Sequence, residues 1–213
     1  ITIMNSINNL KWRYAVKKFD HHKILSDHQI NILKQAFNLT ATSYGLQPIK
    51  LVVVKNKDIQ KELVKHSWNQ QQISQASHLL VICIDTKLDK TDVEKYFERV
   101  KEIRNTPDEI INSFKEFLTT TISEKTTEDL LSWGKNQAYL ALGNLLTVCA
   151  NEKIDSCPME GFIPEKYNEV LGLKEKNLSS VLVLPVGYRA EDDIMTHQKK
   201  VRKNIGEIVI DIS

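Results

Sequence analysis

The sequence predicts an α+β fold in which a few strands are scattered among longer helices. Short runs of β-branched and apolar residues stand apart from one another along the chain, and the segments between them have helical spacing. The two kinds of element do not alternate regularly, so the repeated strand–helix–strand unit of a parallel α/β fold is not indicated. All 213 residues are expected to form one domain, 1–213.

Four strands are expected, at residues 51–54, 79–85, 180–186 and 207–212. Their residues are apolar almost without interruption, instead of alternating with polar ones. This pattern is typical of strands whose two sheet faces are both covered by helices.

Helices are expected between these strands. The first runs from a capping-box pattern at Ser26 to about residue 38, and the others cover 58–66, 91–104, 108–118 and 128–150. The last is apolar most of the way round and would be about 35 Å long at 1.5 Å per residue. It is expected to form either the central spine of the domain or part of a subunit interface.

Composition excludes several classes of protein. With 41% apolar and 26% charged residues the chain is not disordered, and a net charge of +2 does not favour a nucleic-acid partner. The longest apolar runs are far shorter than a membrane span, and no signal peptide is visible. Three cysteines without a CxxC pair fit a reducing cytoplasm, and no metal site is expected.

Nucleotide-binding and hydrolase signatures are absent from the sequence. Its seven glycines form neither GxGxxG nor GxxxxGK[ST], and neither GxSxG nor HExxH occurs. A Rossmann or P-loop site is therefore not supported.

Two basic clusters lie at opposite ends of the chain. Arg13 and Lys17 are four residues apart, so on a helical turn they would face one way, and Lys200 and Arg202 share a face of an extended segment. The clusters could converge on a phosphate. They could equally be solvent-exposed residues that bind nothing, and the spacing by itself favours this second interpretation.

Two polar loops could bring the backbone close to a ligand. Residues 40–48 contain small hydroxyl residues and Gly45, and residues 157–162 contain Pro158 and Gly161. For the second loop, a tight turn without a ligand is the simpler interpretation.

Taken together, six segments resemble the FMN-dependent nitroreductase family, in the same order over nearly the whole chain. They are Arg-Tyr-Ala-x-Lys-x-Phe-Asp (13–20), Thr-Ser-Tyr-Gly-Leu-Gln-Pro (42–48), Ala-Ser-His-Leu-Leu-Val (76–81), Gln-Ala-Tyr-Leu-Ala-Leu-Gly-Asn (137–144), Pro-Met-Glu-Gly (158–161), and Val-Leu-Pro-Val-Gly (183–187) followed by Lys-x-Arg (200–202). The most similar subgroup contains the oxygen-insensitive NAD(P)H nitroreductases and the dihydropteridine-reductase-like enzymes.

The resemblance implies a central mixed sheet surrounded by helices, and a homodimer with two FMN sites at the subunit interface. It implies that Arg13, Lys200 and Arg202 hold the FMN phosphate, and that Tyr14 and Ala15 contact the cofactor through their backbone. Lys17 would lie near N1 and O2 of the isoalloxazine.

The remaining site residues implied by the resemblance fall into three sets. Asn69 and Gln72 would contact the pyrimidine edge, although some relatives have a lysine where this chain has Gln72. Pro158, Glu160 and Gly161 would form the loop beside the flavin N5, with the backbone N–H groups of Glu160 and Gly161 facing it. The partner subunit would supply Thr42, Ser43 and Gly45, with Gln137 nearby.

The implied reaction is a ping-pong transfer of hydride from NADH or NADPH to the flavin, and then to a small-molecule acceptor such as a nitroaromatic or a quinone. Acceptor choice would lie in residues 91–127, where Phe117 is a candidate lid. A flavin-binding or flavin-storing dimer with little turnover is the main alternative. A flavin-fragmenting or dehalogenating relative is a third.

Overall fold

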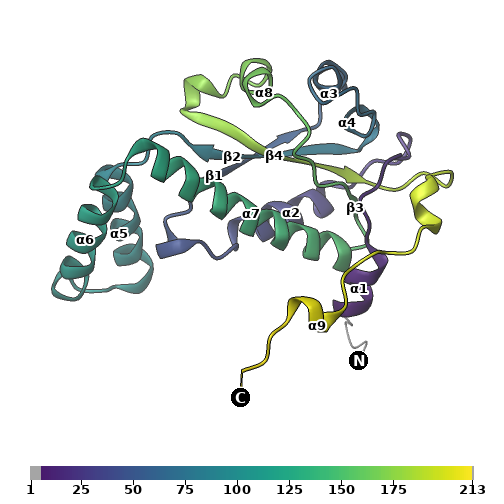
Figure 1. The fold of residues 1–213 in the computed structure, drawn as a ribbon. Helices are drawn as coiled ribbons and strands as arrows, with labels where there is room; N and C mark the ends of the chain where they lie inside the picture. The colour runs from purple at the N-terminus through teal and green to yellow at the C-terminus, as the bar shows by residue number, and fades with distance from the viewer. Residues whose placement is uncertain (1–5, 213) are drawn as a thin grey trace.

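The computed structural model describes residues 6–212, and its centre is a four-stranded sheet (Figure 1). In pairing order its strands are β1 (Ile49–Val54), β2 (His78–Asp85), β4 (Leu178–Gly187) and β3 (Asp155–Ser156). These four strands pair antiparallel throughout, so parallel pairing of the expected mixed kind does not occur between them. A single parallel bridge, between Ala15 and Ser156, extends the sheet at its β3 edge.

Helices cover both faces of the sheet, as the apolar strands predicted. The long helix α7 (Thr127–Asn151) crosses one face together with α2 (Asp27–Asn38). The other face carries α3 (Lys57–Val64), α4 (Gln72–Gln75) and α8 (Pro164–Val170). Alternate residues of β2 pack into the two cores: Leu80, Ile82 and Ile84 on the α7 side, and Leu79, Val81 and Cys83 on the α8 side.

Beyond one end of the sheet, α5 (Lys90–Arg104) and α6 (Asp108–Ser123) form a hairpin with a small core of its own. The left-handed conformation of Asn105 ends α5, and Pro107 precedes α6. The predicted break at Pro107 is therefore confirmed, while α6 continues five residues beyond the expected end at 118.

The N-terminal and C-terminal segments lie side by side at the opposite end of the sheet, and the chain then runs away from the body to its C-terminal end (Figure 1). The N-terminal helix is α1 (Ser6–Trp12), and the C-terminal segment contains only the short helix α9 (Ile205–Ile208). The predicted strand at 207–212 is wrong. Its β-branched residues lack a partner strand in the described part of the chain, and Ile212 is 95% exposed.

The other predicted helices are confirmed, including the cap of α2, where Gln29 N donates to Ser26 Oγ across 3.2 Å. The remaining short helices are the 3₁₀ turns η1 (Ser43–Gly45), η2 (Lys174–Lys176) and η3 (Ile194–His197). One side of α7 lies on the sheet, but Tyr139 and Leu140 are about half exposed on the other. None of the helices within residues 6–212 has the length and apolarity of a membrane span.

Candidate functional site

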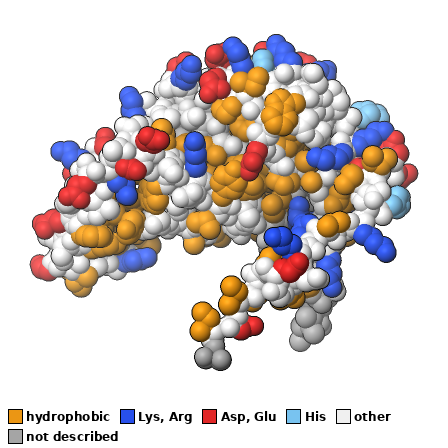
Figure 2. Space-filling view, viewed as in Figure 1, with side chains coloured by type: hydrophobic (Ala, Val, Ile, Leu, Met, Phe, Trp, Pro, Cys, Tyr) orange, Lys and Arg blue, Asp and Glu red, His pale blue; other side chains and the backbone are white. Residues whose placement is uncertain are grey.

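A cavity of about 430 Å³ lies where the N-terminal and C-terminal segments meet. Arg13, Tyr14 and Ala15 form one wall, and Lys200 and Arg202 form the other. Six of the lining residues are Lys or Arg and none is Asp or Glu, within the described chain. Figure 2 shows Lys and Arg side chains gathered at this junction between the body and the C-terminal segment. The structure therefore brings Arg13 of the N-terminal cluster together with Lys200 and Arg202, while Lys17 lies outside the lining of this cavity.

Of the six cations that line this cavity, only Arg189 has an ion pair within residues 6–212. Arg13 Nε is buried, and no group in the described chain accepts a hydrogen bond from it. Burial and the neighbouring Arg202 lower the pKa of Arg13 below its usual value. Burial, Arg13 and Arg202 likewise lower the pKa of Lys200, whose Nζ donates to the carbonyl oxygen of Arg13. A buried N–H donor without an acceptor is costly, and a phosphate group would supply both the acceptor and the opposite charge.

Arg189 stiffens the cavity without contributing a free charge. Its Nε and NH2 groups donate to Asp155 Oδ1 across 2.8 and 2.6 Å, and its backbone N–H donates to Asp155 Oδ2. The guanidinium also lies 4.4 Å from the ring centroid of Trp12 and 4.5 Å from that of Tyr14. These contacts fix the two aromatic residues on either side of Arg13.

Asp193 ties the N-terminal segment to the loop before the C-terminal cations. This buried carboxylate accepts hydrogen bonds from the Tyr14 hydroxyl (3.1 Å), Lys17 N (3.0 Å) and Met195 N (3.0 Å). Residues separated by 179 positions in the sequence are thereby held together.

A continuous strip of contacts leads from the cavity to the loop at 157–161. Val16 N donates to Ser156 O across 3.2 Å, and Lys17 Nζ lies 4.0 Å from Cys157 Sγ. Burial raises the pKa of the Cys157 thiol, while Lys17 and a hydrogen bond with Gln72 oppose that rise. Lys17 and Gln72 therefore meet at one buried thiol.

The strip ends at Gly161. Gln72 Nε2 donates to Gln70 Oε1 across 2.9 Å, and Gln70 Nε2 donates to Gly161 O across 3.1 Å. The ring of Trp68, itself 72% exposed, covers Gly161 so closely that a Cβ atom there would lie 2.7 Å from the ring. A side chain at position 161 would have to displace this ring, so glycine is the residue that allows the close approach. Asn69 is exposed beside Trp68, and both residues have the left-handed backbone conformation.

The loop is also held from its other side. Met159 pairs with Val183 of β4 through both backbone hydrogen bonds, at 2.8 and 3.0 Å, immediately after Pro158. The next residue, Glu160, accepts a hydrogen bond from the Tyr139 hydroxyl of α7 across 2.6 Å. The backbone of residues 158–161 is thus fixed by β4, α7 and the 68–72 segment together.

A second group of predicted residues lies elsewhere in the same chain. Ser43 N donates to Gln137 Oε1 across 2.9 Å, and Gly45 N donates to Thr42 O across 3.0 Å. Gln137 is 14 residues from Asn151 along α7, about 20 Å at 1.5 Å per residue, and Asn151 contacts α1 beside the cavity. One chain does not place Thr42, Ser43 and Gly45 at the cavity.

Phe117 belongs to a partly exposed aromatic row on the α5–α6 hairpin. Its ring stacks on Phe114 with centroids 6.2 Å apart, and Phe114 lies 6.4 Å from Tyr44. The row connects the hairpin with the loop that carries Thr42, Ser43 and Gly45.

Sequence reasoning missed Asp193, Arg189, Trp68 and Tyr139. The contacts of the first two depend on long-range pairing, which no local pattern reveals. A large aromatic residue in an otherwise polar run, as Trp68 is in His66–Gln72, was a signal that could have been followed.

Comparisons with known proteins give this geometry a context. The model of the nitroreductase family matches residues 10–188. YfkO of Bacillus subtilis, which is named for an NAD(P)H nitroreductase activity, is 31% identical over 212 residues that cover 93% of each chain.

Two solved structures share the fold. A nitroreductase-like protein of Streptococcus mutans superposes with a TM-score of 0.85 at 23% identity, covering 97% of this chain and 98% of its own. A protein of Exiguobacterium sibiricum, solved in complex with FMN, gives a TM-score of 0.83 at 17% identity and covers 98% and 97%. With a family match over most of its length, the chain belongs to the nitroreductase family.

Proposed function

We propose that the protein is an FMN-dependent oxidoreductase that takes electrons from NADH or NADPH and passes them to a small oxidised acceptor such as a nitroaromatic or a quinone. The observation that carries this proposal is the convergence of Arg13, Lys200 and Arg202 on one cavity, with the buried Nε of Arg13 lacking an acceptor in the described chain. Family membership and the FMN complex of the Exiguobacterium protein support the choice of this cofactor.

The donor set fits a flavin mononucleotide. The three cations would bind its phosphate, and Tyr14 and Ala15 would run along the molecule. Lys17, Gln72, Glu160 and Gly161, which follow one another along the contact strip, would hold the ring system. Asn69 and Pro158 would complete that edge. These polar groups would position the ring.

Bound FMN would supply the two-electron chemistry, accepting hydride from the nicotinamide and releasing it to the acceptor. The protein's own part is electrostatic. A cation at Lys17 would favour the reduced ring, which carries more negative charge, and so raise its potential. Some relatives have a lysine where this chain has Gln72, so this chain would have one positive charge fewer beside the ring than those relatives have.

We further propose that the enzyme works as a homodimer. Gln137, which accepts a hydrogen bond from Ser43 N, lies about 20 Å along α7 from Asn151, the residue that contacts α1 beside the cavity. Thr42, Ser43 and Gly45 would therefore serve the site of the partner subunit. Apolar side chains are exposed on the elements that would meet the partner: Ile7, Leu10, Tyr139, Leu140, Ile205, Ile208, Ile210 and Ile212. Figures 1 and 2 show the C-terminal segment extending away from the body with apolar residues along it.

The test of the activity is the absorption spectrum of the protein after loading with FMN, followed by anaerobic addition of NADH and then NADPH. Flavin bands near ~450 nm that bleach with either nucleotide are expected. Bands that persist with both nucleotides would favour a flavin carrier, and failure to retain FMN would contradict the proposal.

The dimer is tested by analytical ultracentrifugation. A mass of twice the 24.5 kDa chain is expected. Because the exposed isoleucines would lie against the partner, the double change Ile205→Ser and Ile208→Ser should weaken the association. A monomeric unmodified protein would contradict the proposal.

A further inference from the structure

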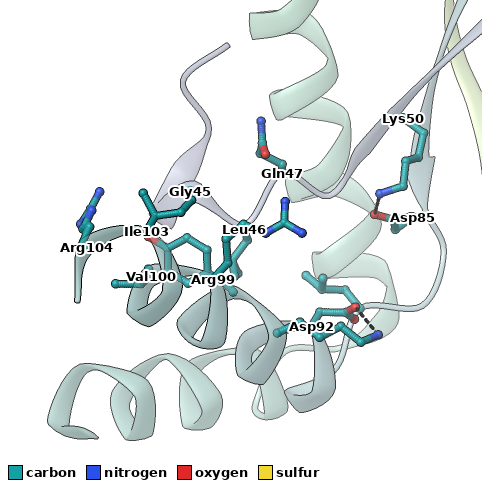
Figure 3. Close-up of a pocket in the computed structure, with 13 residues that line it drawn as sticks. Gly45, Leu46, Gln47, Lys50, Asp85, Asp92, Arg99, Val100, Ile103 and Arg104 are labelled. Carbon is teal, nitrogen blue, oxygen red and sulfur yellow. Dashed lines mark ion pairs between the residues drawn. The ribbon is translucent and has the colours of Figure 1, made fainter. Parts of the chain in front are cut away.

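A second cavity, of about 390 Å³, lies between α5 and the turn that follows η1 (Figure 3). Its walls come from residues 45–47, from the strand ends that carry Lys50 and Asp85, and from one face of α5. It shares no lining residue with the Arg13 cavity, and of the residues assigned to the flavin only Gly45 borders it. Its volume is within the range of small-molecule sites, roughly 300–1,000 Å³.

Part of this cavity is apolar and firmly built. Leu46, Leu88, Tyr96 and Val100 line it, and all four are partly buried against the core of the α5–α6 hairpin. Gly45 approaches Tyr96 so closely that a Cβ atom would lie 3.1 Å from the ring. The turn and the helix therefore form a fixed wall against which an apolar ligand could pack.

The charged part of the cavity has an excess of cations. Each of the two acidic residues that line it forms an ion pair with a lysine: Lys50 Nζ lies 3.8 Å from Asp85 Oδ2, and Lys95 Nζ lies 3.9 Å from Asp92 Oδ1. Arg99 has no ion pair or side-chain hydrogen bond within the described chain, and Figure 3 shows it reaching from α5 toward the wall that carries Lys50 and Asp85.

Arg99 lies close to a second cation on the same helix. Lys95 and Arg99 are four residues apart on α5, where like charges repel. Arg104 also lines the cavity, at the end away from Lys50 and Asp85 in Figure 3. Arg99 is exposed, so an anion bound there would replace water as the acceptor of its N–H groups and offset the local excess of positive charge.

We propose that this cavity binds a small organic carboxylate with an aromatic or aliphatic body. The planar guanidinium of Arg99 presents paired N–H donors that match a carboxylate. The body of the ligand would cover Leu46, Leu88 and Val100, which a free phosphate would leave in water. This site is separate from the one proposed for the flavin.

The test uses full-length protein labelled with ¹³C in its leucine and valine methyl groups, with benzoate as the probe. Benzoate should produce saturable shifts of the Leu88 and Val100 methyl signals, so that binding elsewhere on the protein is distinguished from binding here. Arg99→Gln should weaken this binding at least about tenfold, because it removes a charge-assisted pair. Lys90→Gln, which removes an exposed cation of the same helix outside the cavity, should leave it unchanged.

Two further probes test the chemistry. Benzamide, which has the same ring without the charge, should bind far more weakly than benzoate, and inorganic phosphate should not compete at equal concentration. Absent shifts at Leu88 and Val100, equal binding by Arg99→Gln, or benzamide or phosphate binding as tightly as benzoate would each overturn the proposal. Retention of FMN does not enter any of these readouts, so the two proposals can fail separately.

Discussion

The Tyr139 hydroxyl donates a hydrogen bond to Glu160 Oε1 across 2.6 Å, and this contact fastens the loop at 158–161 to α7. The bond raises the pKa of Tyr139, because the neutral phenol is the form that can donate to the carboxylate. Glu160 therefore has two parts in the proposed site: its side chain anchors the loop, and its backbone would face the ring system.

Removing this anchor should loosen the cofactor. Tyr139→Phe eliminates one exposed hydrogen bond that holds the loop and does not touch the cofactor itself. FMN affinity should therefore fall less than on loss of a direct charged contact, roughly fivefold, measured by the quenching of flavin fluorescence. Tyr188→Phe is the matched control, because it loses a similar bond, to Gln29 Oε1 at 3.1 Å, elsewhere in the fold. Equal affinities in the two variants would show that the anchor does not position the loop.

The phosphate cations can be tested one at a time. Arg202→Gln removes an exposed cation that lines the cavity, and FMN affinity should fall about 10- to 100-fold, the usual worth of a charge-assisted hydrogen bond. Lys203→Gln removes the adjacent cation, which does not line the cavity, and should have little effect. A similar loss of FMN affinity in both variants would show that net charge, and not a specific contact of Arg202, determines the affinity.

Two ion pairs should differ sharply in their effect on stability. The Arg189 guanidinium is largely buried, and Asp155→Asn removes its charged partner. The free energy of unfolding should therefore fall by about 3 kcal/mol. Asp192→Asn breaks the exposed pair with Lys18 and should produce no measurable change in urea unfolding. Comparable effects of the two substitutions would contradict this reading of Asp155 as a structural centre.

Acid sensitivity should come partly from His78. Burial, with help from Lys55 and Lys57, lowers the pKa of His78 to about 4, against 6.5 for the unfolded chain. Between these values the unfolded state binds more protons, so the free energy of unfolding should decrease as pH falls from 6.5 to 4, by up to about 3 kcal/mol.

The ring of His78 is held in place by its neighbours. Leu25 N donates to Ser77 Oγ across 2.8 Å, and a hydrogen bond of 2.9 Å joins Ser77 Oγ and His78 Nδ1. His78→Gln should flatten the pH dependence of urea unfolding, whereas His28→Gln, at an exposed position, should leave its slope unchanged. An unchanged slope in both variants would assign the acid sensitivity to other groups.

Much of the fold could be predicted because its signals are local. The capping box at Ser26, the break at Pro107 and the apolar strands all depend on neighbouring residues. The strand at 207–212 was wrong because Val209, Ile210 and Ile212 have strand-forming side chains, while strand formation also needs a partner that the described chain does not supply.

The site was predicted less completely, for a related reason. Arg13, Lys200 and Arg202 could be proposed together because a family resemblance joins the two ends of the chain. Asp193 and Tyr139 act through contacts with Tyr14 and Glu160, and only the folded chain brings these pairs together.

The most direct test of the central claim compares FMN with riboflavin, which lacks only the phosphate. If Arg13, Lys200 and Arg202 form a phosphate site, FMN should bind at least about 100-fold more tightly than riboflavin, and Arg202→Gln should narrow that ratio. Both affinities follow from the quenching of flavin fluorescence under identical conditions. Equal binding of FMN and riboflavin by the unmodified protein would contradict the account.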